Sequence, residues 1–154
     1  MSTSAYVSAS AATGAPFAIV ADSIRRPRAA VKVQSVAVAS HLSVTVSVDV
    51  PAAVERRGVA DVFVVVAERG LVSVVGRGEN RGRTLIHGAV ARSLNPLGDL
   101  SERNRTFAGT VDVAVARTWT FPNLQIAGVI QERDSRRILG AGAVEPSFRP
   151  GSDQ

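Results

Sequence analysis

The stretch from Leu42 to Val50 constrains the fold of this chain more than any other segment. Every even-numbered position in it is Leu or Val, and every odd-numbered position is Ser, Thr or Asp. Successive side chains of a β-strand point to opposite faces, so this period of two predicts a strand with one buried and one solvated face. Strands of that kind are typical of antiparallel sheets.

Two segments on either side of this stretch also have the pattern of strands. Val31–Gln34 alternates, but the phase slips between Val33 and Val36, which predicts a bulge or an early end of the strand. Asp61–Glu68 is a continuous apolar run with charged ends. Its short length favours a central strand that is buried on both faces.

After a turn at Gly70, the rest of the chain also has the pattern of successive strands. Residues 71–75 are expected to form a strand, and alternate apolar positions from Phe107 to Val115 predict a long one. Leu124–Gln131 and Ile138–Val144 predict two more strands, joined by a polar hairpin loop. The periodicity of Ile86–Leu94 fits either a short helix or an irregular strand.

These patterns together predict an all-β protein. The expected fold is an antiparallel, immunoglobulin-like β-sandwich of about seven strands over residues 28–146. Residues 1–16 are rich in Ser and Ala and are expected to be a disordered tail, as are residues 147–154. In residues 17–26 the apolar side chains recur on one helical face, which predicts one short N-terminal helix.

Composition excludes several kinds of function. The chain has 154 residues, no Cys and two His, so thiol chemistry, cysteine zinc sites and multi-histidine metal centres are not expected. No apolar run is long enough for a membrane-spanning helix, and the N-terminus lacks the features of a signal peptide. The net charge is +5, and all basic residues except Lys32 are Arg. We therefore expect a non-enzymatic protein without metal or cofactor.

The most distinctive segment is the Gly- and Arg-rich stretch from Gly76 to Thr84. It does not fit a dinucleotide fingerprint, because Arg81 occupies the third glycine position. It does not fit a P-loop either, because five residues separate the two glycines and Arg83 replaces the Lys. What remains is a loop that binds an anion or a partner, or a turn with a purely structural role.

The two interpretations use the same residues. As a structural turn, the loop would pair Glu79 with Arg83 or Arg92, Asn80 would cap a turn, and the glycines would adopt positive φ. As a binding loop, it would offer its guanidinium groups to a protein ligand or, as the alternative function, to nucleic acid. The candidate binding residues are Arg77, Glu79, Asn80, Arg81, Arg83, His87 and Arg92.

A hydrolase built on His87 is a third, less favoured hypothesis. In it His87 is the general base, Ser93 or Thr84 the nucleophile, and Asp99 the residue that orients the imidazole. No Gly-x-Ser-x-Gly nucleophile elbow accompanies these residues. We therefore name no catalytic residue.

The segment Gly76–Arg92 resembles a motif of bacterial thioredoxin-like secreted proteins, the domain-of-unknown-function 1223 family and relatives of outer membrane protein 28. The resemblance extends to Trp119–Gln131 and to Ile138 and Leu139, and it covers about residues 28–146. The residues that match the motif are Gly78, Glu79, Asn80, Gly82, Arg83, Leu85, His87, Val90 and Arg92, and Ala91 departs from the usual Val.

The resemblance implies a role and a compartment. Members carry a thioredoxin-like domain with a Cys-x-x-Cys pair, followed by a β-rich domain, and this chain resembles the second. The helix expected at residues 17–26 would then be the remnant of the first domain. The implied function is a non-catalytic accessory or binding domain outside the cytoplasm, with a thioredoxin-like domain or an extracytoplasmic protein or ligand as its partner. The redox motif cannot be transferred, because there is no Cys.

Overall fold

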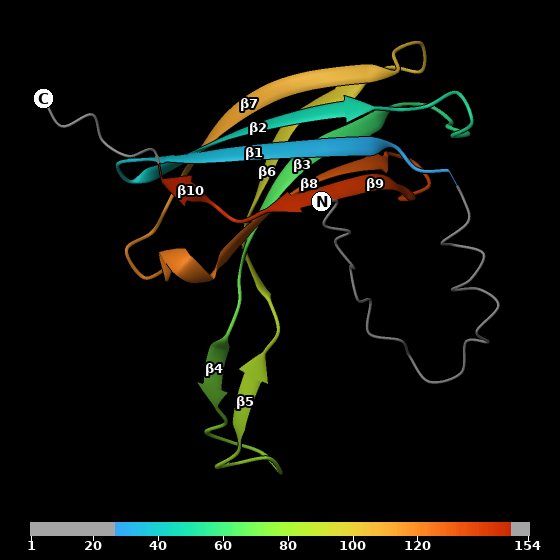
Figure 1. The fold of residues 1–154 in the computed structure, drawn as a ribbon. Helices are drawn as coiled ribbons and strands as arrows, with labels where there is room; N and C mark the ends of the chain where they lie inside the picture. Colours follow the sequence, from blue (N-terminus) through green and yellow to red (C-terminus); the bar gives the residue numbers. More distant parts are fainter. Residues whose placement is uncertain (1–26, 149–154) are drawn as a thin grey trace, which may run out of the picture.

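The computed structural model describes residues 27–148, and within them two β-sheets lie face to face as a sandwich (Figure 1). The predicted all-β, antiparallel sandwich is therefore confirmed. The two sheets contain eight strands rather than about seven, and two further strands form a separate ribbon. The tail at residues 1–16 and the helix expected at residues 17–26 lie outside the described residues.

The first sheet contains the strand with the strictest alternation. Its order is β10-β1-β2-β7, where β1 is Ala30–Val38, β2 is His41–Asp49, β7 is Thr106–Ala114 and β10 is Ser147–Phe148. All neighbours are antiparallel except β10, which runs parallel to β1. The two residues of β10 fall in the segment that was expected to be a C-terminal tail.

The second sheet has the order β6-β3-β8-β9. Its strands are β3 (Ala60–Glu68), β6 (Val90–Leu100), β8 (Leu124–Glu132) and β9 (Ile138–Val144). A 3₁₀ turn, η1 at Phe121–Asn123, leads into β8. The central position predicted for β3 is confirmed, because it pairs with β6 on one side and β8 on the other. One face of β3 is buried, whereas the other is half-buried.

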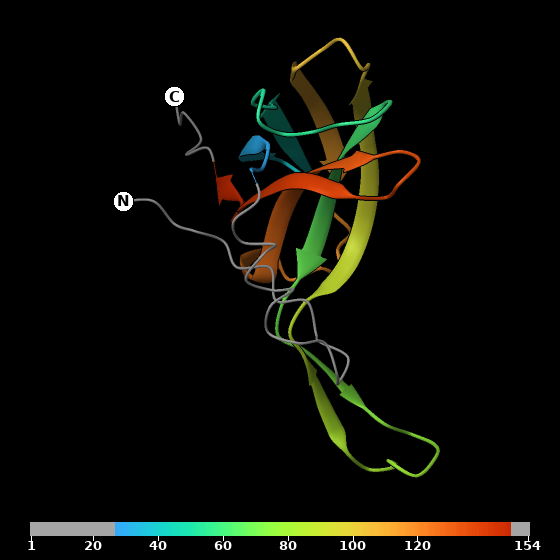
Figure 2. The same ribbon diagram turned by 90° about the vertical axis from the view of Figure 1, so that its right-hand side faces the viewer.

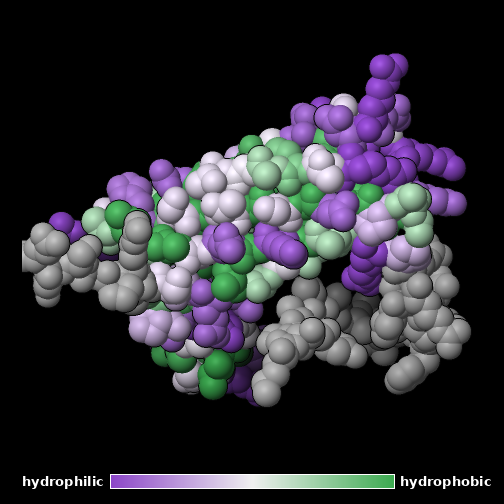
Figure 3. Space-filling view, turned by 45° about the horizontal axis from the view of Figure 1, so that its top comes forward, coloured by the Kyte–Doolittle hydropathy of each residue, from purple (hydrophilic) through white to green (hydrophobic). Residues whose placement is uncertain are grey.

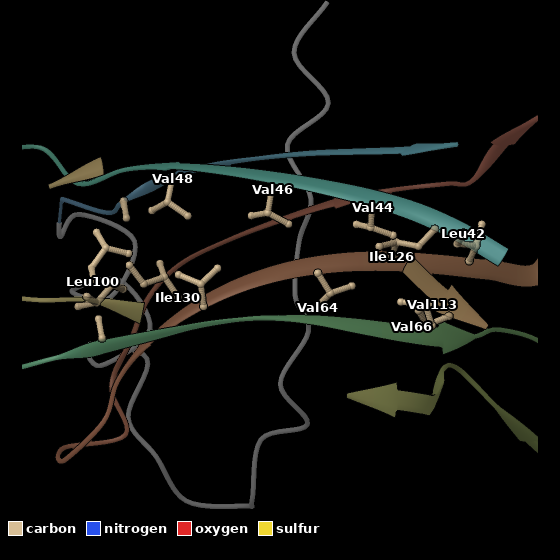
Figure 4. Close-up of a cluster of buried hydrophobic side chains, with 14 of the residues drawn as sticks. Leu42, Val44, Val46, Val48, Val64, Val66, Leu100, Val113, Ile126 and Ile130 are labelled. Carbon is tan, nitrogen blue, oxygen red and sulfur yellow. The ribbon is translucent and has the colours of Figure 1, made fainter. Parts of the chain in front are cut away.

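The core lies between the inner faces of the two sheets. Side chains of β2 lie opposite those of β3 and β8 (Figure 4). The alternation that predicted β2 is reproduced in its burial, because its even-numbered residues are the buried ones. The hydrophobic residues with no exposed surface are Leu42, Val44, Val46, Ala60, Val64, Val66, Leu124, Ile126 and Ile130.

The phase slip predicted in the first strand is not a bulge. β1 pairs with β2 over nine consecutive residues without a register shift, and it continues to Val38. The inward positions are Val31, Val33, Ser35 and Ala37, so a serine occupies a core-facing position. The predictions of a bulge and of an early strand end were both wrong. The buried Ser35 interrupts the alternation of apolar and polar residues, and this interruption resembles a change of phase.

Two glycines of β9 allow β1 to cross the edge of the second sheet. An added Cβ at Gly140 would lie 2.3 Å from the carbonyl oxygen of Ala29, and one at Gly142 would lie 2.2 Å from that of Val31. Ala29 also donates a backbone hydrogen bond of 2.9 Å to the carbonyl of Leu139. The backbones of β1 and β9 are therefore in direct contact, which no side chain at these positions would allow.

Between β3 and β6 the chain leaves the sandwich. Within residues 27–148, β4 (Leu71–Val74) and β5 (Thr84–His87) pair only with each other, and they extend away from the two sheets (Figures 1 and 2). We call residues 69–89 the arm. Ile86–Leu94, which fitted either a helix or an irregular strand, contains the end of β5 and the beginning of β6.

Candidate functional site

The arm is a two-stranded antiparallel ribbon with one apolar face. Val72 lies opposite Ile86, and Val74 lies opposite Thr84, so these four side chains share a face. Val72 is 58% exposed, Val74 72% and Ile86 78%. In the space-filling view, hydrophobic and hydrophilic surfaces lie side by side at the end of the molecule that contains the arm (Figure 3). An isolated two-stranded hairpin has marginal stability in water, so this face is suited to contact with a partner.

The tip of the arm, residues 75–83, holds the Arg-rich loop. Val75 donates to the carbonyl of Arg83 at 2.9 Å, and Gly82 donates to the carbonyl of Val75 at 2.8 Å, which closes the loop. Gly78 and Gly82 have φ of 86° and 84°, where a side chain would be strained, as the turn interpretation required. The remaining predicted residues of the tip are all exposed: Arg77, Glu79, Asn80, Arg81 and Arg83.

The root of the arm is held by a buried carboxylate. Glu68, the last residue of β3, has a fully buried side chain. Its Oε2 accepts a 2.7 Å hydrogen bond from Nε of Arg92, and its Oε1 accepts one of 2.9 Å from the backbone N–H of Thr120. The Thr120 hydrogen bond, with Arg92, lowers the pKa of Glu68 against the opposing effect of burial. Because Glu68 precedes β4 and Arg92 follows β5, this pair joins the two chains that enter and leave the arm.

The prediction that Glu79 forms an ion pair with Arg83 or Arg92 is therefore wrong. Arg92 pairs with Glu68 at the root, and Glu79 has no ion-pair partner within residues 27–148. The physical reason is that β5 carries the chain from the tip back to the sandwich before Arg92 is reached. Arg92 thus lies beside the carboxylate that ends β3, not beside the one in the loop.

His87 does not assemble the residues of a hydrolase. Its Nε2 lies 2.9 Å from Oγ of Ser73, across the ribbon. Ser93, one of the two expected nucleophiles, accepts a hydrogen bond from Asn95, and Asp99 pairs with Arg133. Thr84, the other, is three positions before His87 in β5 and so lies on the opposite face of the ribbon. Within residues 27–148 no carboxylate hydrogen-bonds the His87 ring. The proposed set is dispersed over the arm and the second sheet.

Apart from the arm, a concave surface lies on the outer face of the second sheet. It is an open groove of about 440 Å³ with Phe63, Leu94 and Pro96 among its lining residues. Arg133 at its rim is held by Asp61 at 2.5 Å and Asp99 at 3.0 Å. The charges at this rim largely pair with one another, so the groove offers no obvious reactive group.

The structure thus divides the seven predicted site residues into three groups. Five are gathered at the tip, His87 lies on β5, and Arg92 belongs to the root. The apolar face was not predicted, because Val72 and Val74 have the pattern of an ordinary sandwich strand. Glu68 was not predicted either, although the charged end of the apolar run was a signal.

Neither a cluster of metal-ligating side chains nor a membrane-spanning helix is seen in the described part of the chain. No cluster of three or more His, Asp or Glu there could hold a metal ion. Among residues 27–148 there is also no helix long and apolar enough to cross a membrane.

Comparisons with known proteins identify relatives of this chain. HBP35 of Porphyromonas gingivalis is similar over 93% of this chain, with a TM-score of 0.63 and 13% identity, and this chain spans 50% of its length. A domain of the outer membrane lipoprotein Omp28 from Porphyromonas gingivalis is similar over 80% of this chain and 92% of that domain, with a TM-score of 0.54 and 12% identity.

These identities are low enough that the two structures establish the fold alone. No curated protein sequence matches the chain. The family described as "Protein of unknown function (DUF1223)" matches residues 6–131. The chain therefore belongs to the DUF1223 family.

Proposed function

We propose that this chain is a non-catalytic binding domain and that the arm is the surface that holds its partner. The observation that carries the proposal is the apolar face formed by Val72, Val74 and Ile86. These side chains contribute little to the sandwich core, yet they stand in water on a ribbon that cannot bury them by itself. Apolar surface on a protruding ribbon is explained if another molecule covers it.

The partner that fits best is a thioredoxin-like domain. The resemblance of Gly76–Arg92 to the motif of thioredoxin-like secreted proteins supports this choice, because that motif covers most of the tip, the second strand of the arm and the first residues of β6. A second support is that this chain spans only half of the HBP35 chain, so the similar protein contains a further region of comparable size. In this proposal the arm brings the sandwich and the thioredoxin-like domain together.

The test is binding to a thioredoxin-like domain encoded in the same genome, measured by calorimetric titration with the full chain. We expect micromolar affinity, and we expect the double variant Val74→Ser with Ile86→Ser to weaken it at least about tenfold. Val38→Ser is the matched control, because Val38 is a 55% exposed valine of the sandwich. Equal losses in the two variants would show that the arm is not the surface.

A second candidate function is binding to nucleic acid through the tip. The observation that favours it is that Arg77, Arg81 and Arg83 are all exposed at the end of a two-stranded ribbon, a shape that a major groove admits. Three phosphate contacts predict that log K falls by about 2.7 per log unit of salt. Micromolar binding to duplex DNA at physiological salt, lost in the triple Arg→Ala variant, would place this function first.

We also propose that the protein acts outside the cytoplasm. The support is the resemblance to secreted proteins, together with the similarity to a domain of Omp28, which is described as an outer membrane lipoprotein. Cell fractionation with an antibody against the chain tests this compartment. Recovery with cytoplasmic markers alone would contradict it.

A further inference from the structure

The edges of the two sheets are not equally protected against pairing with another chain. β10 is only two residues long, and β9 is covered by the crossing of β1. β6 contains Pro96, which has no N–H to donate, and its pairing with β3 has two register shifts. Such features interrupt the regular hydrogen-bonding pattern that a new strand needs.

The edge formed by β7 is neither short nor interrupted by a proline, and only its first part is covered, where Phe107 packs against Gly98 of β6 and Leu97 lies beside Gly109. It pairs with β2 over nine consecutive residues without a shift, and it contains no Pro, Lys or Arg. Asp112 is its one charged residue. The strand lies at the edge of the first sheet, on the side of the sandwich away from the arm (Figure 1). No described strand pairs with its second side.

The sequence of β7 is complementary to itself. An antiparallel pairing of two copies that uses all nine residues places Thr110 opposite Thr110 of the second copy. It then places Asp112 opposite Ala108 of the second copy, so no like charges meet. The remaining opposed pairs consist of apolar, Gly and Thr side chains: Phe107 with Val113, Gly109 with Val111, and Thr106 with Ala114.

We propose that two copies of this chain associate through β7 in this register, across a two-fold axis. The two four-stranded sheets then form one continuous eight-stranded sheet. The outer positions of β7 fit this arrangement, because Ala108, Thr110 and Asp112 are exposed and none is bulky. The arms lie on the far side of each sandwich and stay free for a partner, so this association is independent of the proposed function.

Because Ala108 lies opposite Asp112 of the second copy in this register, two substitutions at Ala108 should change the dimer affinity in opposite directions. Ala108→Asp would set two pairs of like charges across the dimer axis, whereas Ala108→Arg would set two attractive pairs with Asp112 of the second copy. Sedimentation velocity of the full chain, from about 5 to about 500 μM, measures the dimer dissociation constant. We expect a value between about 1 and about 100 μM for the parent, weakened at least about fivefold by Ala108→Asp and tightened about threefold by Ala108→Arg.

Two further variants locate the interface. Ala141→Asp adds the same charge to an exposed position of β9 and should leave the dimer unchanged. Ile86→Ser alters the apolar face of the arm and should also leave it unchanged. A parent protein that stays monomeric over this range would overturn the proposal. A dimer that responds to Ile86→Ser but not to the two Ala108 variants would overturn it as well.

Discussion

Arg92 and Glu68, separated by twenty-four positions in the sequence, form an ion pair of 2.7 Å in which the carboxylate is fully buried. The pair lies where the arm leaves the sandwich, and Thr120 completes it from the segment before β8. Three chain segments therefore meet at one carboxylate. The pair links the segment that enters the arm to the segment that leaves it, while the charged side chains of the tip are exposed.

Replacing Glu68 by Gln should lower the melting temperature substantially. The change leaves the guanidinium of Arg92 without its counter-charge in a partly buried position, and breaking a pair of this kind is strongly destabilising. We expect a decrease in Tm of about 5–10 °C in a calorimetric scan. Glu79→Ala is the matched control at the exposed tip, and it should change Tm by less than about 1 °C. Equal melting of both variants and the parent would mean that the root pair has no role in stability.

The stability of the domain should decrease in acid. The Arg137 guanidinium, helped by Ser135 and the N–H of Arg57, holds the pKa of Glu132 at about 2, well below its ordinary value of 4.5. The pKa of Glu68 is also lowered. Between the folded pKa of Glu132, about 2, and its ordinary value of 4.5, the unfolded chain binds more protons than the folded one. The free energy of unfolding contributed by these carboxylates is therefore complete above about pH 5 and is lost as the pH falls toward about 2.

Urea unfolding at a series of pH values measures this dependence. The variant Glu132→Gln should be less stable at neutral pH and should show a flatter decrease between about pH 5 and about pH 2, because one of the two carboxylates no longer titrates. If the variant and the parent lose stability in parallel, Glu132 is not a source of the acid sensitivity.

Much of the sandwich could be predicted from the sequence, and the exceptions have physical causes. The strict alternation in β2 and the apolar run of β3 indicate their positions, because burial on one or both faces of a sheet determines residue type directly. Ser35 broke the alternation of β1, although the strand is continuous. A single buried hydroxyl cannot be distinguished from a change of phase without the partner strand.

The candidate site was less predictable. The Arg-rich loop was located at the tip of a turn by its glycines, since positive φ has a local signature in sequence. The Glu68–Arg92 pair and the exposure of Val72 depend on where the sheets end, which is a property of the assembled fold. Alternation predicts which side chains share a face, but it does not reveal whether that face meets a core or water.

Adding one methyl group to β9 should separate it from β1. In Gly142→Ala the new Cβ would lie 2.2 Å from the carbonyl oxygen of Val31, a backbone atom that cannot rotate away. We expect a decrease in Tm of about 5 °C or more, from overpacking at a close backbone approach. Gly88→Ala is the control, because a Cβ there meets nothing within 4 Å. A Gly142→Ala variant that melts with the parent would show that β1 can move away at no cost.

The proposal that the arm is the binding surface is tested most directly by NMR on the full ¹⁵N-labelled chain, titrated with the thioredoxin-like domain. We predict that amide signals of residues 71–87 shift or broaden, while those of the buried positions of β2, such as Val44 and Val46, remain in place. In the Val74→Ser, Ile86→Ser variant the signals of the arm should no longer respond. Binding that perturbs the sandwich and leaves residues 71–87 unchanged would contradict the account.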